Sequence, residues 1–424
     1  MSDLPVGWNE STIVNLIGKD GLFSDGDWVE SKDQDPNGAI RLLQLADIGD
    51  GKFVNKSHRF VNDKKFELLN FTEILEDDVL VARMPDPLGR ACLMPKLPQK
   101  CITVVDVAII RPGKDSVLPR WLMHFLNSPE IRQRIELLSS GTTRKRISRG
   151  NLAQIELPIP PLNEQKHIAE KLDSLLARVD SCQTHLERVP QILKRFRQSV
   201  LAAATSGRLT EDWREEKGVN GEWEETDIQS VAFVGTGSTP LRSNSNFYSS
   251  KGTPWVTSAA TGQTFIHSAK EFVTKEAISA HRLKLFPVGT VIVAMYGEGK
   301  TRGQVSELAI EATINQACAA IVVDEAKVTK KYLKLALQAN YLEMREMSEG
   351  GNQPNLNLSK IKEFTFPLPS PEEQTEIVRR VEKLFAYAAK LEARYTSASE
   401  HVERLTPSLL AKAFRGDLVG QEQG

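Results

Sequence analysis

Two segments of the chain carry the same long hydrophobic repeat. Apolar residues recur at alternating intervals of four and three from Ile168 to Val200, and again from Ile377 to Leu409. A period of 3.5 residues keeps one narrow stripe facing a partner helix, whereas a lone helix lying on a globular core has a wider stripe with a period of 3.6. The pattern therefore predicts two long helices that pair as a coiled coil. The predicted seam residues are Ile168, Leu172, Leu175, Val179, Leu186 and Phe196 in the first helix, and Ile377, Val381, Leu384, Leu391, Leu405 and Leu409 in the second.

Both predicted helices have the same kind of boundaries. PIPPLNEQ (158–165) and PLPSPEEQ (367–374) place prolines before the helix and acidic residues in its first turn, where the helix dipole favours them. Gly207 and Gly416 follow the last turns, as glycine caps commonly do. These boundaries support two helices of equal length.

Pro190 distinguishes the first helix from the second. Proline removes a backbone donor and clashes with the preceding turn, so we expect a kink near Val189. Ala398 occupies the matching position in the second helix. Only one of the two helices should therefore bend.

The two helices belong to a longer internal repeat. LPIPPLNEQKHIAEKLDSLL (157–176) aligns without a gap with FPLPSPEEQTEIVRRVEKLF (366–385), and SVLAAATSGRL (199–209) aligns with SLLAKAFRGDL (408–418). The chain is therefore two copies of one unit, each a globular region followed by a helix.

The globular regions are weakly similar to each other. EDDVLVARM (76–84) resembles PVGTVIVAM (287–295), and ITVVDVAII (102–110) and TVIVAM (290–295) look like buried strands. We predict an α+β protein in which two mixed domains are separated by two long helices. The predicted segments are domain 1 (1–157), helix 1 (158–208), domain 2 (209–366), helix 2 (367–416) and a tail (417–424), with EDWREEKGVNGE (211–222) as a polar linker.

Chain geometry predicts how the helices run. The first helix ends where the second domain begins, and the second helix starts where that domain ends. If the two ends of a domain lie close together, as they often do, the helices run antiparallel and the molecule has a pseudo-twofold axis. From Ile168 to Val200 the predicted seam spans 32 residues, or about 48 Å at about 1.5 Å per residue. That length exceeds the roughly 34 to 36 Å of one DNA turn.

Composition limits the class of protein. The 424 residues suggest two or three domains, and 40% hydrophobic residues suffice for real cores. No apolar run reaches the roughly 20 residues that cross a bilayer, and the start has no export signal, so a cytoplasmic protein is expected. The four cysteines form no C-x-x-C pair and the seven histidines are scattered, so neither a disulfide framework nor a metal site is expected.

Nucleic-acid binding requires locally concentrated basic residues, because the formal net charge is −1. GTTRKRISRGN (141–151) holds four basic and no acidic residues. A glycine-led basic loop presents guanidinium groups to guanine edges or phosphates, although a merely solvated loop is an equal alternative. The residues predicted here to contact DNA are Arg144, Lys145, Arg146 and Arg149.

The second globular region carries different polar groups at the equivalent position. EGGNQPNLNLSKIKEF (349–364) contains amide side chains, which pair with adenine. YGEGKTRG (296–303) forms a basic turn after a buried strand, and phosphate contact is the role expected there. The residues predicted to contact DNA are Asn352, Gln353 and Asn355, together with Tyr296, Lys300 and Arg302.

The helical motifs resemble the specificity subunits of Type I restriction-modification systems, most closely the Type IA branch. The resemblance lies in PIPPLNEQ, IAEKLDSLLARVD (168–180), LKRFRQSVL (193–201), SPEEQTEIVRRVEKLFAYA (370–388) and SLLAKAFRGDL. It implies that each globular region is a target recognition domain for one half of a bipartite, asymmetric site in double-stranded DNA. It implies that the helices set the unread spacer and dock two methyltransferase (M) subunits.

The same resemblance implies that restriction/translocase (R) subunits join this core. It places no catalytic site and no cofactor in this chain, and assigns S-adenosylmethionine, ATP and Mg to the partner subunits. One departure is the tail DLVGQEQG (417–424), which lacks the tryptophan of TEDWREEKG (210–218).

Two other classes of protein were weighed against this one. FVGTG (233–237) has the form of an S-adenosylmethionine loop, but the Asp/Asn-Pro-Pro-aromatic tetrapeptide that an amino-methyltransferase needs does not occur. The acid-x-Lys triplets at 215–217 and 325–327 have no convincing metal-binding partner. A protein-binding coiled-coil scaffold without DNA readout accounts for the seams, but not for two domains that differ most in their polar loops.

Overall fold

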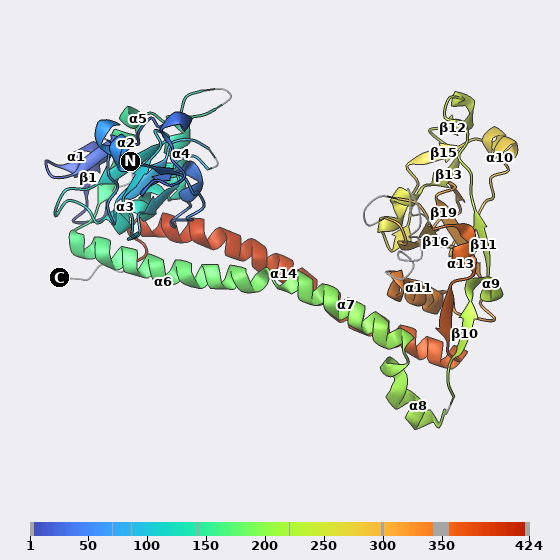
Figure 1. Cartoon of the computed structure of the whole chain (residues 1–424). Coiled ribbons are helices and arrows are strands. Elements are labelled where there is room, and N and C mark those ends of the chain that lie inside the picture. The colour runs from blue at the N-terminus through green and yellow to red at the C-terminus, as the bar shows by residue number, and fades with distance from the viewer. Residues whose placement is uncertain are drawn as a thin grey trace. The chain divides into compact units, whose positions relative to one another are not determined.

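The computed structural model describes residues 4–69, 71–85, 87–141, 144–219, 221–297, 301–341 and 356–419 (Figure 1). The chain divides into two compact units. Unit 1 comprises residues 1–187 and 396–424, and unit 2 comprises residues 188–395. Each unit holds one globular domain and part of each long helix, and each is described by itself.

Domain 1 (residues 9–159) contains two small sheets. The larger is antiparallel, in the order β2 (Leu22–Asp25), β8 (Val107–Arg111), β5 (Val79–Ala82) and β6 (Ala91–Leu93). The smaller has the order β4 (Phe60–Val61), β3 (Ile40–Leu43) and β7 (Cys101–Thr103), with β3 and β7 parallel. A separate pair, β1 (Asn9–Thr12) with β9 (Glu156–Ile159), joins the start of the domain to its end.

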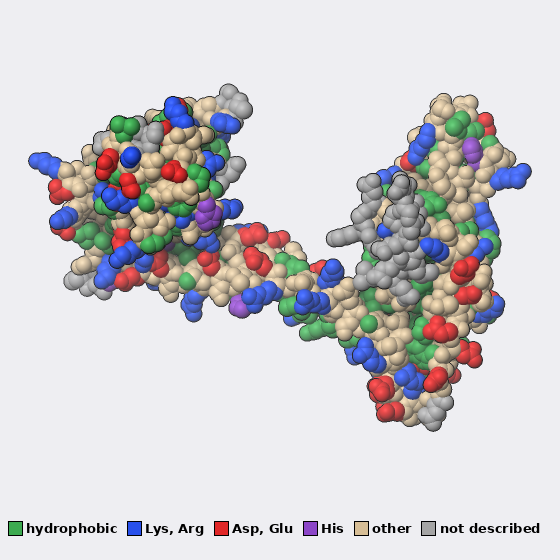
Figure 2. Space-filling model, in the orientation of Figure 1, with side chains coloured by type: hydrophobic (Ala, Val, Ile, Leu, Met, Phe, Trp, Pro, Cys, Tyr) green, Lys and Arg blue, Asp and Glu red, His purple; other side chains and the backbone are tan. Residues whose placement is uncertain are grey.

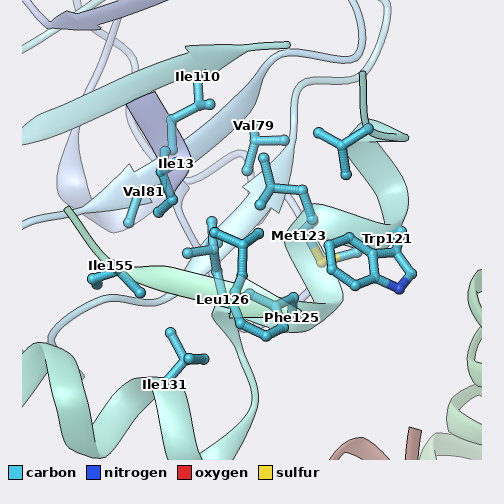
Figure 3. Packing of buried hydrophobic residues seen from close by; sticks show 14 of the residues in the cluster. Ile13, Val79, Val81, Ile110, Trp121, Met123, Phe125, Leu126, Ile131 and Ile155 are labelled. Atoms are coloured by element: carbon cyan, nitrogen blue, oxygen red, sulfur yellow. The ribbon is translucent and has the colours of Figure 1, made fainter. Parts of the chain in front are cut away.

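Short helices cover the larger sheet of domain 1. They are α1 (Ile13–Ile17), α3 (Pro119–Leu126), α4 (Pro129–Leu137) and α5 (Arg149–Ala153); α2 (Asp63–Leu69) precedes β5. Trp121 and Phe125 of α3 stack with their ring centroids 5.4 Å apart and share one core with Val79 and Ile110 of the sheet (Figure 3). The apolar face of α3 therefore fixes the sheet to the helical layer.

Domain 2 (residues 224–368) repeats the same plan. Its larger sheet has the order β11 (Ala232–Thr236), β19 (Cys318–Val323), β16 (Val291–Ala294), β17 (Val305–Leu308) and β14 (Phe265–Ile266). Its smaller sheet has the order β12 (Tyr248–Ser249), β15 (Glu271–Val273), β13 (Thr253–Val256) and β18 (Thr313–Ile314), and β10 (Glu224–Asp227) pairs with β20 (Thr365–Leu368). The helices are α9 (Ile228–Val231), α10 (Lys275–His281), α11 (Lys330–Ala339) and α13 (Leu358–Lys362). The internal repeat therefore extends through both globular regions, with β12 and β14 as additions in the second.

The two predicted long helices are present. The first is divided into α6 (Leu162–Leu186) and α7 (Val189–Thr205), and the second is one helix, α14 (Pro371–Ala413). The break falls beside Pro190, as predicted, and Pro190 lies in the first turn of α7, where a missing N–H costs no hydrogen bond within the helix. Pro407 lies inside α14, which continues through it. Gly207 and Gly416 follow the last turns with φ values of 78° and 85°, which glycine adopts without strain.

The helices run antiparallel within each unit. In unit 1, Ile168 and Leu172 near the start of α6 share a core with Leu410 and Ala413 at the end of α14. In unit 2, the end of α7 meets the start of α14, because Val200 shares a core with Ile377 and Val381. The predicted fold class, two mixed domains with two long antiparallel helices, is confirmed.

The predicted seam is mostly covered, with one exception. Ile168, Leu172, Val179, Ile377 and Val381 are buried, and Leu175, Leu186, Phe196, Leu384, Leu391 and Leu409 are partly buried. Leu405 is 42% exposed, so its prediction as a seam residue is wrong. The stripe also widens at the helix ends, where Ala169 and Val378 are buried as well, because these turns pack on a domain in addition to the partner helix.

Two buried glutamines explain the shared motif before each helix. The Gln165 side chain accepts a hydrogen bond from the Leu118 backbone N–H (2.8 Å) and donates to the Pro160 carbonyl (2.9 Å). Gln374 repeats both contacts with Thr329 (2.7 Å) and Pro369 (2.9 Å). Each glutamine therefore ties the start of a long helix to the first turn of the domain helix α3 or α11.

The segment predicted as a polar linker is instead the helix α8 (Glu211–Lys217). Arg214 forms an ion pair with Glu373 (2.6 Å), which also accepts hydrogen bonds from Thr210 (2.7 Å) and the Trp223 indole (2.9 Å). The partners that order this helix lie on the first turn of α14. The polar sequence of residues 211–222 did not predict these contacts.

A second correction concerns residues 102–110, which were predicted as one strand. They form most of β7 and β8, separated by a turn at Val104–Asp106. The turn leaves the Val105 carbonyl free to accept side-chain hydrogen bonds.

The C-terminal tail packs on domain 1. Phe414 lies edge-on to Trp121 and Phe125, with centroid distances of 5.5 and 5.2 Å, and Leu418 and Val419 contact the same core. Lys171 of α6 donates to the Leu418 carbonyl (2.7 Å). The described part of the tail, residues 417–419, therefore contacts the domain 1 core without the tryptophan found in the first copy.

Truncating a residue of this shared core should destabilise unit 1. Leu172→Ala removes a side chain that is fully buried between α6 and α14, and we expect a loss of about 2 to 5 kcal/mol in the free energy of unfolding. Urea unfolding followed by tryptophan fluorescence measures it. The matched control, Leu137→Ala, changes a 77% exposed side chain and should cost less than about 0.5 kcal/mol. Equal effects would contradict the described packing.

Candidate nucleic-acid interface

The basic loop predicted in domain 1 lies beside one end of the larger sheet. Ser140 and Arg146 exchange two backbone hydrogen bonds (2.9 and 2.8 Å), which close the loop. Gly141 has φ of 103°, and a Cβ there would lie 2.5 Å from the Arg144 carbonyl oxygen. The loop therefore needs glycine at its start, as the sequence pattern indicated.

Arg146 belongs to a group of charged residues, from the buried Arg83 to the exposed Arg149, that we call the arginine cluster. Its members are Arg83, Arg146, Arg149, Asp25 and Asp106. Arg83 contacts Asp25 (3.0 Å), and Arg146 contacts Asp106 (3.3 Å). Both arginines donate to the Val105 carbonyl oxygen, at 2.6 and 3.2 Å. Two predicted residues, Arg146 and Arg149, are thus brought together with three that the sequence reasoning missed.

The arginine cluster carries an excess of positive charge. Burial lowers the pKa of Arg83, the carboxylate of Asp25 opposes that change, and the charges of Arg146 and Arg149 lower the pKa further. Three arginines against two aspartates leave one net positive charge. Acidic and basic side chains are interspersed over the face of unit 1 in Figure 2, so positive charge is a local rather than a domain-wide property.

The remaining basic residues of the loop differ in their surroundings. Lys145 is exposed and pairs with Glu136 of α4 (2.7 Å), and this hydrogen bond lowers the pKa of Glu136. Arg144 is exposed. Arg149 is the first residue of α5 rather than a loop residue, and the Ser148 hydroxyl caps that helix by accepting from the Asn151 N–H (3.0 Å).

Domain 2 places its equivalent loops at the same end of its sheet. The Leu356 N–H donates to the Met295 carbonyl (3.2 Å), as the Ile147 N–H donates to the Arg83 carbonyl (3.1 Å) in domain 1. VLVA of β5 therefore corresponds to VIVA of β16, and Met295 takes the place of Arg83. The hairpin that contains Tyr296 thus has a counterpart in domain 1, beginning at Arg83.

Several predicted residues of domain 2 are not described. Tyr296 is 36% exposed and follows β16 directly, and Arg302 is partly buried. The predicted contacts at Lys300, Asn352, Gln353 and Asn355 fall outside the described residues.

In domain 2, uncharged residues take the places of Asp25 and Asp106, and the charged Arg302 lies in the hairpin that follows β16. Thr236 and Thr239 replace Asp25 and Trp28 of domain 1, and Gln316 and Ala317 replace Val105 and Asp106. The Thr239 hydroxyl donates to the Gln316 amide oxygen. The ungapped alignment of EDDVLVARM with PVGTVIVAM sets Met84 against Met295, whereas the backbone hydrogen bonds shift the register by one residue and set Arg83 against Met295. The repeat therefore gave no signal for this difference.

The possible S-adenosylmethionine loop has a different structure. Residues 232–236 form β11, which pairs antiparallel with β19 along its whole length. A Cβ on Gly237 would lie 1.6 Å from the Ile314 carbonyl oxygen, so this glycine serves close backbone packing. Among the described residues, no group of three or more His, Cys, Asp or Glu side chains is arranged to hold a metal ion, and no helix is long and apolar enough to span a membrane.

Comparison with known proteins identifies the family. The profile described as "Type I restriction modification DNA specificity domain" matches twice, over residues 5–191 and 220–398. The chain belongs to this family. It is 31% identical to the Type I restriction enzyme StySPI specificity subunit of Salmonella potsdam, over 99% of this chain and 90% of that one. It is 31% identical to the EcoKI specificity subunit of Escherichia coli K12, over 90% of this chain and 83% of that one.

Solved structures have the same fold. The HsdS subunit from Thermoanaerobacter tengcongensis superposes with a TM-score of 0.67 at 19% identity, covering 98% of each chain. A chain from a structural study of complex assembly in the type I restriction-modification system superposes with a TM-score of 0.76 at 19% identity, covering 99% of this chain and all of that one.

Removing one charge of the arginine cluster should weaken DNA binding. If Arg146 contacts a phosphate, Arg146→Gln should lower affinity for any duplex and reduce the slope of log affinity against log salt by about 0.9. Fluorescence titration with a labelled duplex between 50 and 200 mM salt, roughly the range over which such contacts weaken, measures both. Arg59→Gln removes an exposed arginine of the same domain and serves as control. Identical titrations for the two variants would exclude Arg146 from the interface.

Proposed function

We propose that this chain is the DNA sequence-specificity subunit of a Type I restriction-modification complex, in which each domain reads one half of a bipartite, asymmetric site. The observation that carries the proposal is the pair of equivalent sheet ends. One scaffold, with the same backbone hydrogen bond at Ile147 and Leu356, carries the charged Asp25 and Asp106 in domain 1, where domain 2 has the uncharged residues Thr236 and Ala317. Different hydrogen-bonding groups on one frame are what two half-site readers need.

The long helices are proposed to set the unread spacer and to dock two methyltransferase subunits, with restriction/translocase subunits joining that core. The 43 residues of α14 span about 65 Å at about 1.5 Å per residue. A DNA turn is only about 34 to 36 Å, so the helix is long enough to relate two readers on successive stretches of a duplex.

Catalysis and cofactors are proposed to belong to the partners. The amino-methyltransferase tetrapeptide is missing from the sequence, and the one glycine pattern of methyltransferase form lies within β11. S-adenosylmethionine, ATP and Mg are assigned to the methyltransferase and restriction subunits. The purified chain should accordingly neither methylate nor cut DNA, and methyl transfer from radiolabelled S-adenosylmethionine to duplex DNA by this chain alone would overturn that assignment.

A gel shift with the methyltransferase subunits present distinguishes this function from a protein-binding scaffold. A specificity subunit gives DNA affinity that falls steeply as salt rises, because phosphate contacts release counterions. A scaffold gives no such affinity. Base-resolved methylation mapping in cells that carry this subunit and its partners then identifies the two half-sites.

Lengthening both helices should lengthen the spacer. One heptad is inserted after Val179 in α6 and another before Val402 in α14, both within unit 1, so that the stripe stays in register. Each helix grows by about 10 Å, so the spacer should grow by about three base pairs while both half-sites are still read. Inserting two residues instead rotates the stripe away and should impair folding. An unchanged spacer at full activity of the heptad variant would show that other elements fix the distance.

A further inference from the structure

At Arg83 the two domains share a backbone hydrogen bond but carry different side chains. It follows β5 directly, as Met295 follows β16. In both domains the backbone carbonyl at this position accepts a hydrogen bond from the loop that carries the predicted DNA contacts, from Ile147 at 3.1 Å or Leu356 at 3.2 Å. The position therefore belongs to the frame that holds each reading loop.

The side chain of Arg83 does not reach solvent. It is 3% exposed, and its guanidinium group contacts Asp25 (3.0 Å) and the Val105 carbonyl (2.6 Å). A buried arginine in this place has no contact with a duplex of its own. Any role in DNA reading acts through its neighbours.

Those neighbours are the exposed members of the arginine cluster. Arg146 is 40% exposed and shares the Val105 carbonyl with Arg83. The positive charges of Arg146 and Arg149 act on Arg83, so the buried charge repels both of them in turn. The printed contacts of Arg146 run inward, to Asp106 and to the carbonyl that Arg83 also binds, so the guanidinium group is anchored on one side while the rest of it stays accessible. Asp25 pairs with Arg83, and Asp106 pairs with Arg146.

We propose that Arg83 is a positioning residue for half-site recognition by domain 1. Its side chain binds the Val105 carbonyl and Asp25 and so holds in place the turn on which Arg146 is anchored. The accessible part of the Arg146 guanidinium group then meets a guanine edge or a phosphate of one half-site. This inference rests on the proposed function. In domain 2 the position is Met295, and Thr236 and Ala317 replace Asp25 and Asp106, so only the first half-site depends on this device.

The test is Arg83→Met, which installs the residue of the other domain. The complex of the variant with its methyltransferase partners is expressed in cells, and methylated sites are mapped at base resolution. We expect discrimination to fall about 5- to 100-fold at one or more bases of one half-site, with the other half-site and the spacer unchanged. Arg83→Lys keeps the charge and should restore much of the discrimination. Arg59→Met removes an exposed arginine from the same domain and should leave the motif intact.

The readout separates positioning from general stability. A purely structural role lowers the amount of methylation but leaves the recognised bases unchanged, and that result would overturn the proposal, as would equal relaxation of both half-sites. If Arg83→Met fails to assemble, Asp25→Asn removes the ion partner at a partly exposed site and should relax the same bases. A wild-type complex without a bipartite motif would refute the proposed function itself, whereas a normal wild-type motif that is unaltered in the variants refutes only the role of Arg83.

Discussion

Neither domain has a complete core without the long helices. Leu410, Ala413 and Phe414 at the end of α14 pack into the core of domain 1, against Trp121 of α3. Val200 and Ala204 at the end of α7 enter the core of domain 2 in the same way. Burial of this apolar surface is the main stabilising term in each unit, so the direction of each helix is fixed relative to the domain on which it packs. At the start of the other long helix in each unit, a buried glutamine fixes the position of that helix against the domain: Gln165 of α6 in unit 1 and Gln374 of α14 in unit 2.

The ends of the two larger sheets are not constrained by this packing. There the backbone is shared between the domains, but the side chains are not. The buried Arg83 and the partly exposed Arg146 both bind the Val105 carbonyl in domain 1, and in domain 2 Gln316 takes the place of Val105 and Thr236 that of Asp25. Polar groups at the rim of a sheet can change without disturbing the core, because the strands that carry them are held by Val79, Val81, Val291 and Val293, all fully buried. The residues that differ between the two sheet ends are therefore separate from those that hold the fold.

The sequence predicted the parts of the structure that depend on local pattern. The 3.5-residue period located both helices, Pro190 located the break, and the repeat located the basic loop and its counterpart. What it missed depends on partners far away in the chain. The order of α8 depends on Glu373, and the place of Arg83 depends on Asp25 and Val105.

Two further errors have local physical causes. The apolar run at 102–110 hides a turn, because Val104 and Val105 look like strand residues although the chain reverses there to pair β7 and β8 with different sheets. Leu405 has seam spacing but is exposed, because the buried stripe of α14 shifts to Leu410 and Ala413 where the helix meets domain 1. Spacing alone does not identify which face a helix turns toward a third element.

We expect the two domains to be interchangeable frames whose sheet ends decide what is read. This is tested by replacing residues 1–157 with a second copy of residues 209–366 and mapping methylation at base resolution in cells with the partner subunits. The half-site read by domain 2 should then appear twice across a spacer of unchanged length. An assembled complex that still methylates the original asymmetric site would contradict it.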